Sequence, residues 1–341
     1  MTPRIHMIRF FACLAFASVL SAQIQTTAYV QESTVGTNGN TAPLGCSATG
    51  LFAEAHSQIL IPAQHLPGPG AILLGLAALG QSGAATNTTL TYSLLRIRIS
   101  RTAATSLNAT FANNLLQPQT LLDVANLTVN WQVNQFTPIT FLNNYIHDGQ
   151  SSLVIDIQKI VSPIGDATMK TIENSRRTDL PRMINAFGTV GSGAHAAAVA
   201  TATNNSPLSF ELRWAGPFGA HTPTVKLKSD PTAPFRAPFG IGRPLDTIVQ
   251  AEPGSFFATF ASTTMAAPVA VPGIIGQVWL GAPVLLNGDV VPAVGGHTTT
   301  FVLPNDPSLV GLYIAFQSLV IEQDGEWRLT NLADCFVSNG L

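Results

Sequence analysis

The segment from Thr298 to Glu322 constrains the fold of this chain more than any other. Strand-forming residues flank a turn, Leu-Pro-Asn-Asp-Pro at 303–307, in which the prolines cannot donate to a β-ladder and Asn305 and Asp306 can cap their own backbone. After the turn both alternating faces of the chain are apolar, which a strand tolerates only when it is covered on both sides. The segment therefore predicts a hairpin deep inside a β-sandwich.

Short strand patterns bounded by Pro, Gly and Asn recur about every ten residues along the chain. In one of them Arg96 and Arg98 alternate with Ile97 and Ile99, which predicts the arginines on one face and the isoleucines in a core. This spacing favours an all-β fold of antiparallel, jelly-roll-like sandwiches over βαβ units. The remaining predicted strands cover residues 56–62, 71–79, 90–100, 121–131, 136–142, 152–160 and 208–214.

Residues 1–22 have the features of a cleaved secretory signal. Arg4 and Arg9 precede an apolar run at 10–20, and small residues stand before Gln23. The run is shorter than the ~20 residues that span a bilayer. We therefore expect a secreted, extracellular or cell-surface protein.

The mature chain would have about 319 residues, which fits two domains better than one. Its first part is rich in Thr, Asn and Gly, with too little apolar content to fold alone. A short Gly- and Pro-containing stretch then separates two strand-rich regions. We expect two β-sandwich domains in tandem, with these bounds: lead-in 23–50, first domain 51–214, linker 215–220 and second domain 221–341.

Residues 253–288 carry no charge, so a hydropathy window would mark a transmembrane helix there. Pro268, Pro272 and Pro283 would break such a helix. Three or four buried strands explain the composition better, and no membrane span is expected in the mature chain.

The chain is poor in charge, with 10% charged residues, a formal net charge of -2 and a pI near 6.4. Neither nucleic acid nor an anionic membrane surface is therefore an expected partner. An unusual share of the charge lies in 166–187, which could form a short helix ended by Pro181. Arg176, Arg177 and Arg182 could bind an anion or carboxylate ligand there, or the segment could be a solvated excursion between strands.

Cys46 and Cys335 are the two cysteines that remain after removal of residues 1–22. In an oxidising compartment they could form a disulfide between the two domains. The alternative is two separate thiols, because a bridge requires Cα atoms within ~7 Å.

The sequence predicts no catalytic residue, no cofactor and no dedicated metal site. Ser82 follows an apolar run but precedes a poor helix, so a hairpin loop explains it better than a nucleophile elbow. His147-Asp148 could serve a general base, but a tight Asp-Gly turn is the simpler interpretation. Trp327, beside Asp-Gly-Glu, is predicted to reach solvent and contact a ligand. The other tryptophans, predicted to be in the core, are Trp131, Trp214 and Trp279.

Several motifs, in this order, are similar to those of secreted tandem β-sandwich proteins of the planctomycete type. They are Asn-Gly-Asn-Thr-Ala-Pro at 38–43, Ala-His-Ser-Gln-Ile-Leu-Ile-Pro-Ala at 55–63, Leu-Leu-Arg-Ile-Arg-Ile-Ser at 94–100 and the stretch at 303–317. The resemblance covers nearly all of the mature chain and implies two extracellular β domains, with no established catalytic residues to transfer. The chain departs from the pattern at His56, where an aromatic is more common, and lacks an early cysteine in the second domain.

Two functions follow from these observations. The first is a non-enzymatic structural or adhesive protein of the cell surface that contacts glycans or other surface proteins. The alternative is a secreted, glycan-directed hydrolase on a jelly-roll scaffold, because one fold hosts unrelated functions.

Overall fold

The computed structural model is all-β, and its strands are joined by turns and short 3-10 segments. It describes residues 26–30, 35–40, 43–47, 50, 52–80, 88–132, 135–162, 171–174, 183–204, 210–216, 222–229, 239–294, 296–337 and 339. Among these residues no helix has the length and apolar character needed to cross a membrane. The expected signal at 1–22, Ser82 and the three arginines at 176, 177 and 182 lie outside the described residues.

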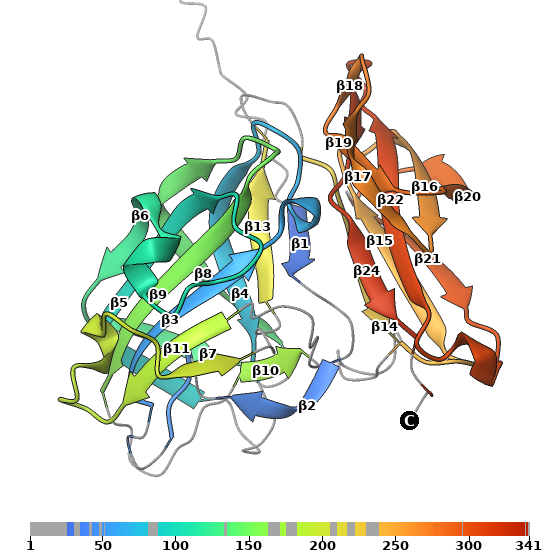
Figure 1. Ribbon diagram of the computed structural model, residues 1–341. Helices are drawn as coiled ribbons and strands as arrows, with labels where there is room; N and C mark the ends of the chain where they lie inside the picture. Colours follow the sequence, from blue (N-terminus) through green and yellow to red (C-terminus); the bar gives the residue numbers. More distant parts are fainter. Residues whose placement is uncertain are drawn as a thin grey trace, which may run out of the picture.

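Strands β1 to β13 form the N-terminal body, on the left of Figure 1. A four-stranded sheet has the order β1 (Thr26–Val30), β13 (Phe210–Ala215), β4 (Ile72–Leu79), β8 (Phe136–Ile146). The facing sheet has the order β12 (Ala202–Asn204), β11 (Met183–Gly188), β3 (Glu54–Ile61), β9 (Ser152–Val161), β5 (Thr88–Thr102), β6 (Leu116–Val124), with β7 (Leu127–Trp131) also on β5. The remaining elements are β2 (Val35–Asn40), which pairs with β10 (Thr171–Asn174), and the 3-10 segments η1 (Ala63–His65), η2 (Phe111–Asn114) and η3 (Ala194–Ala196).

Strands β14 to β24 form the C-terminal body, on the right of Figure 1. One sheet has the order β14 (Thr224–Ser229), β15 (Pro244–Gln250), β21 (Gly296–Val302). The second has the order β18 (Ile274–Ile275), β23 (Trp327–Leu329), β22 (Tyr313–Ile321), β16 (Phe256–Ser262), β20 (Val284–Val290), with β24 (Ala333–Phe336) also on β22. A ribbon of β17 (Met265–Ala270) and β19 (Gln277–Leu280), and the 3-10 segment η4 (Pro307–Leu309), complete it.

The predicted hairpin across Thr298–Glu322 is wrong. β21 pairs with β15, whereas β22 pairs with β16, β23 and β24, so the two strands belong to different sheets. The Asp306 carboxylate does cap the turn by accepting a hydrogen bond from the Ser308 amide at 2.9 Å. The turn therefore carries the chain from one sheet to the other, and β22 is an interior strand of its sheet.

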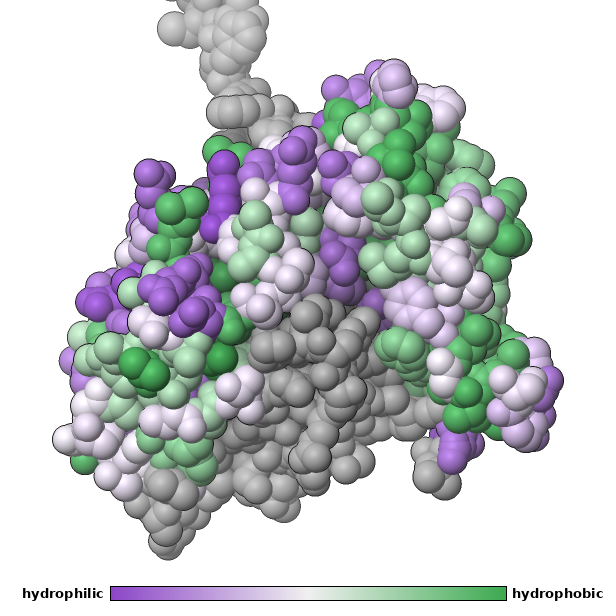
Figure 2. All heavy atoms as spheres, viewed as in Figure 1, coloured by the Kyte–Doolittle hydropathy of each residue, from purple (hydrophilic) through white to green (hydrophobic). Residues whose placement is uncertain are grey.

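The uncharged segment 253–288 forms strands, as expected, but the expectation that they are buried is wrong for β17 and β20. All six residues of β17 and six of the seven in β20 are exposed. Figure 2 shows hydrophobic residues along the outer side of the C-terminal body, and Val284 and Leu285 on β20 are among the most exposed apolar side chains. In this segment the lack of charged residues accompanies exposure to solvent and not burial.

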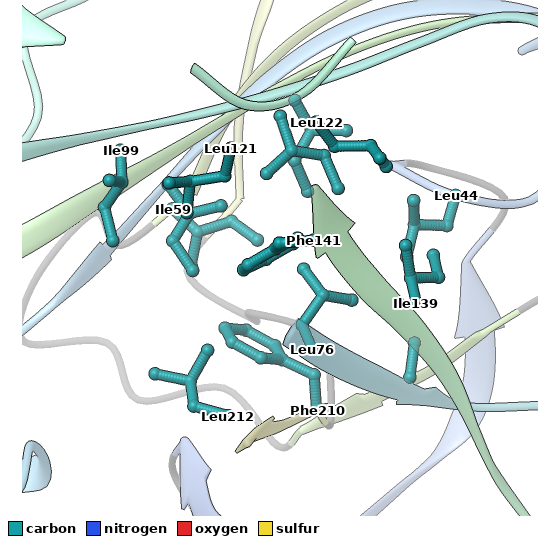
Figure 3. Close-up of a cluster of buried hydrophobic side chains, with 14 of the residues drawn as sticks. Leu44, Ile59, Leu76, Ile99, Leu121, Leu122, Ile139, Phe141, Phe210 and Leu212 are labelled. Carbon is teal, nitrogen blue, oxygen red and sulfur yellow. The ribbon is translucent and has the colours of Figure 1, made fainter. Parts of the chain in front are cut away.

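The core of the N-terminal body lies between its two sheets (Figure 3). Alternation on β5 directs Ile97 and Ile99 inward, as predicted, while Arg96 and Arg98 lie on the outer face. Trp131 and Trp214 are buried, which confirms their predicted core positions. A small cavity within this core has only apolar lining residues, which are Leu44, Ile59, Leu76, Ile155, Ile157 and Phe210.

The described residues within 23–50, a segment expected to be a lead-in, contribute to the N-terminal body. Thr26 pairs with Trp214 as β1 aligns antiparallel to β13. Leu44 and Cys46 are buried in the core. Apolar content was too low for this segment to fold alone, but pairing with β13 supplies partners for its backbone.

Two further predicted elements differ from the structure. The single strand predicted at 121–131 is two strands, β6 and β7, separated by a turn in which Asn126 has a positive φ of 57°. The helix suggested within 166–187 is also wrong for the described part, because 171–174 and 183–187 lie in strands β10 and β11.

The two bodies contact each other through hydrogen bonds between distant segments. The Thr26 hydroxyl donates to the Thr222 carbonyl at 2.7 Å, and the Leu332 amide donates to the Gln64 carbonyl at 2.6 Å. These two hydrogen bonds therefore join β1 and η1 directly to the C-terminal body.

Candidate functional site

A row of buried polar side chains lies on the outer face of the larger N-terminal sheet. Glu54, His56 and Gln58 alternate along β3, so they share one face, opposite to Ile59 in the core. In the antiparallel register Gln58 is opposite Asp156 on β9, and Asp156 is opposite Arg98 on β5. Three neighbouring strands therefore bring these charged and polar groups together.

Asp156 is the centre of this outer polar cluster, which we define as His56, Gln58, Arg98, Asn114 and Asp156. Asn114 of η2 belongs to it because its Nδ2 donates to Gln58 Oε1 at 2.8 Å. One carboxylate oxygen accepts from His56 Nε2 at 2.7 Å and from Gln58 Nε2 at 2.8 Å. The other accepts from Arg98 Nε at 2.9 Å and lies 2.8 Å from a second guanidinium nitrogen. Burial raises the pKa of Asp156, but these bonds and charges outweigh it and lower the pKa overall.

Both ring nitrogens of His56 face hydrogen-bond acceptors of the protein. Its Nε2 faces Asp156, and its Nδ1 lies 2.9 Å from the carbonyl oxygen of Ala197. Because both partners are acceptors, both nitrogens must donate for both bonds to form. The ring also stacks on Phe111 of η2, with centroids 3.7 Å apart. His56 therefore fastens the loops that cover the sheet, and the geometry favours a structural role.

A second histidine and carboxylate pair lies at the end of the same row. His195 Nδ1 is 3.0 Å from a carboxylate oxygen of Glu54, and the Gly191 amide donates to the other oxygen at 2.6 Å. Burial raises the pKa of Glu54, but hydrogen bonds from His195 and Gly191 lower it by more. The side chain of His195 is partly exposed, so this pair could orient its imidazole toward solvent.

The Asp-Gly turn predicted at His147-Asp148 is confirmed. The Asp148 carboxylate accepts from the amides of Gln150 and Ser151 at 2.9 and 2.8 Å, and Gly149 has a φ of +74°. His147 is buried, and burial lowers its pKa to about 4, so its ring is neutral near pH 7. Neither residue is placed to act as a general base at the surface.

Trp327 reaches solvent, as the sequence predicted, with 44% of its surface exposed. It begins β23, where it pairs with Ile321 on one side and Ile274 on the other. By contrast Trp279 is only partly exposed and packs against the core cluster of Leu280. Trp327 is the most accessible tryptophan of the chain's described residues.

Cys46 and Cys335 are separate buried thiols, the second of the two arrangements that the sequence left open. Cys46 lies in the main core of the N-terminal body, whereas Cys335 packs with Leu227, Leu245 and Phe316 in the C-terminal body. Burial raises the pKa of the Cys46 thiol, although the nearby Lys159 opposes this effect.

The turn between β22 and β23 carries a group of carboxylates that sequence reasoning missed. We call residues 322–326 the acidic turn. Glu322, Asp324 and Glu326 each place one carboxylate oxygen within 4.8 Å of the others. Arg328 Nε donates to Glu322 at 3.2 Å, and the same guanidinium pairs with Glu326. The alternating acidic residues were visible in the sequence, but their closeness was not.

The comparisons with known proteins place the chain in no family, since no family model and no curated protein matches it. Among solved structures it is similar to a β-1,2-glucanase from Parabacteroides distasonis, with 10% sequence identity and a TM-score of 0.22. The match covers 92% of this chain but only 37% of that enzyme's chain. At this TM-score the similarity supports no conclusion about fold or function. The class that the fold itself defines is an all-β protein of antiparallel sheets.

Proposed function

We propose that the protein is a secreted or cell-surface, non-enzymatic β-sandwich protein that contacts glycans through Trp327 and the acidic turn. The observation that carries this proposal is the exposed indole of Trp327, which directly follows the carboxylates of Asp324 and Glu326. Sugar rings present C–H faces that stack on an indole and hydroxyl groups that donate to carboxylates. Both kinds of group needed for sugar binding therefore occur within one short segment, residues 324–327.

Two of the described histidines, His56 and His147, lack a position suited to catalysis at the surface. In the outer polar cluster both nitrogens of His56 are engaged, and the charges of Asp156 and Arg98 neutralise each other. His147 is buried and neutral near pH 7. His56 thus joins the sheet to the loop at Ala197, whereas the ring of His147 is enclosed in the protein and does not reach the surface.

The apolar surface of the C-terminal body supports contacts with other macromolecules at a cell surface. Val284 and Leu285 on β20 and Val269 on β17 are all more than half exposed. Exposed apolar side chains of this kind are typical of surfaces that contact other molecules. The partner at this surface would be a surface protein, while the glycan contact is assigned to Trp327.

Binding of the purified protein to a panel of immobilised polysaccharides tests the proposal. We expect retention on at least one polysaccharide, and loss of that retention in Trp327→Ala. The matched control is Phe256→Ala, which removes another exposed aromatic side chain of the same body, 46% exposed. Equal retention of both variants, or no retention by the parent on any polysaccharide, would contradict the proposed glycan contact.

The alternative, a glycan-directed hydrolase, is favoured by one observation, the partly exposed His195 oriented by the buried Glu54. Release of reducing ends from the same polysaccharides would test it. Under this alternative His195→Ala would abolish release, whereas Trp327→Ala would weaken substrate binding alone. No release from any polysaccharide by the parent protein would reject it.

A further inference from the structure

The acidic turn contains a buried carboxylate oxygen that the protein does not satisfy. The side chain of Glu322 is 1% exposed, and its Oε2 accepts a hydrogen bond from Arg328 Nε at 3.2 Å. Its Oε1 is shielded from solvent and has no hydrogen-bond partner within the described part of the chain. Buried carboxylate oxygens are normally paired, because leaving one unpaired costs its full desolvation penalty. The orphaned oxygen therefore points to a missing partner.

The other carboxylates of the turn could share that partner. One oxygen each of Glu322, Asp324 and Glu326 lies within 4.8 Å of the others, close enough for one ion to contact all three. Arg328 pairs with Glu322 and Glu326, but each carboxylate has a second oxygen. With all three carboxylates ionised, the three acids and one guanidinium sum to a charge of about -2, which a divalent cation would neutralise. Burial and the nearby carboxylates raise the pKa of Glu322 to about 7, so near neutral pH the cation would displace a proton from this group.

The donor set selects the kind of cation. All three groups offer hard carboxylate oxygens, and neither His nor Cys belongs to the cluster. Oxygen-only sites suit calcium or magnesium rather than zinc or copper. Calcium accepts irregular geometry and completes its coordination with waters and backbone carbonyls, whereas magnesium requires a near-ideal octahedron. A turn with two exposed ligands and one buried ligand fits the more tolerant ion.

We propose that the acidic turn binds one calcium ion through the carboxylates of Glu322, Asp324 and Glu326. The ion site is defined by three carboxylates of the protein, two of which, Asp324 and Glu326, also belong to the proposed glycan contact. Sites with three protein carboxylates and several waters bind weakly, so we expect a Kd on the order of 0.1–1 mM, as in extracellular calcium modules. Bound calcium would also fix the turn that precedes Trp327.

Terbium luminescence and calorimetry test the proposal on the full protein. Tb³⁺ replaces calcium and emits when a neighbouring tryptophan is excited, and Trp327 directly follows Glu326. We expect saturable emission on excitation of tryptophan and its displacement by Ca²⁺. Trp327→Phe should lose most of the emission but keep the calorimetric binding of Ca²⁺. Trp327→Phe removes the indole of the proposed glycan contact but leaves the three carboxylates in place. Calorimetry on this variant therefore tests the ion site separately from glycan binding.

Three variants decide which residues bind the ion. Glu322→Gln and Asp324→Asn should each weaken Ca²⁺ binding about tenfold or more, since each removes a charged ligand. Asp289→Asn, an exposed carboxylate of the same body outside the cluster, should bind as the parent does. Asp324 is exposed, so its variant tests the site even if Glu322→Gln does not fold. Absence of saturable Ca²⁺ binding, or equal binding by all three variants, would overturn the proposal.

Discussion

The ammonium group of Lys159 donates to the carbonyl oxygen of Gly45 inside the core of the N-terminal body. Lys159 lies on the inward face of β9 between Ile157 and Val161, and it is fully buried. Burial lowers its pKa to about 7, although the nearby Cys46 opposes this effect. The Lys159 amine therefore connects the loop at 43–46 to the sheet, and it is partly neutral near pH 7.

This burial predicts that the N-terminal body gains stability as pH rises from 7 to 9. The unfolded chain, with a lysine pKa near 10.5, binds more protons than the folded one in this window. The free energy of unfolding should therefore increase by about 2 kcal/mol between pH 7 and 9. Above pH 9 the raised pKa values of Cys46 and Tyr92 act in the opposite direction.

Urea denaturation of the parent and of Lys159→Met at both pH values measures this effect. The variant keeps the length of the side chain but cannot titrate, so its stability should vary little across the window. An equal rise with pH in parent and variant would show that another group is responsible.

Replacing Asp156 should lower the free energy of unfolding far more than replacing Asp123, another aspartate on the same face of the sheet. Asp156→Ala leaves Arg98 and His56 without their buried partner, which should cost about 3–5 kcal/mol. The control is Asp123→Ala, which breaks an exposed pair with Arg96 and should cost at most about 1 kcal/mol. Thermal unfolding compares the two variants, and similar losses would contradict the structural role of the outer polar cluster.

Burial on β22 and exposure on β20 predict opposite responses to the same substitution. Val320→Asp places an unpaired charge beside Phe257 in a closed core and should unfold the C-terminal body. Leu285→Asp changes a side chain that is 58% exposed and should alter stability by less than about 0.5 kcal/mol. Near-ultraviolet circular dichroism distinguishes them, and unfolding of the β20 variant would show that this surface is covered in solution.

Gly149, in the β8–β9 connection, is predicted to tolerate replacement less well than Gly191, between β11 and η3. A Cβ atom there would lie 2.4 Å from the backbone nitrogen of Pro69, and the φ of +74° already disfavours other residues. Gly191 also has a positive φ, of +81°, but a Cβ would meet open space. Gly149→Ala should therefore lower the melting temperature clearly more than Gly191→Ala, which would pay only the left-handed strain of about 1–2 kcal/mol. Equal decreases in melting temperature for the two variants would mean that Pro69 shifts enough to accommodate the added Cβ atom.

The sequence predicted strands well because alternation is local. The inward isoleucines and outward arginines of β5 follow from a period of two, whatever the rest of the chain does. Turn chemistry at 303–307 also correctly marked a turn. It could not identify the sheet that β22 would join, since partner choice depends on packing between residues far apart in the chain.

Exposure and site geometry were harder to predict for related reasons. Apolar composition at 253–288 indicated burial, yet much of any protein surface is apolar, so composition alone does not place a strand inside. His56 and Asp156 are 100 positions apart, and only the register of β3 against β9 brings them together. The alternation of Glu322, Asp324 and Glu326 was visible in the sequence, but only the turn at 322–326 brings their carboxylates together.

The pairing of β1 with β13 has a consequence for biosynthesis. The first described strand cannot find its partner until residues 210–215 have been made, so the four-stranded sheet remains incomplete while the intervening chain is produced. Until then β4, whose partner on that side is β13, presents an open edge. A nascent chain halted before β13 would thus be prone to aggregation, whereas one halted just after it has every described strand of the N-terminal body.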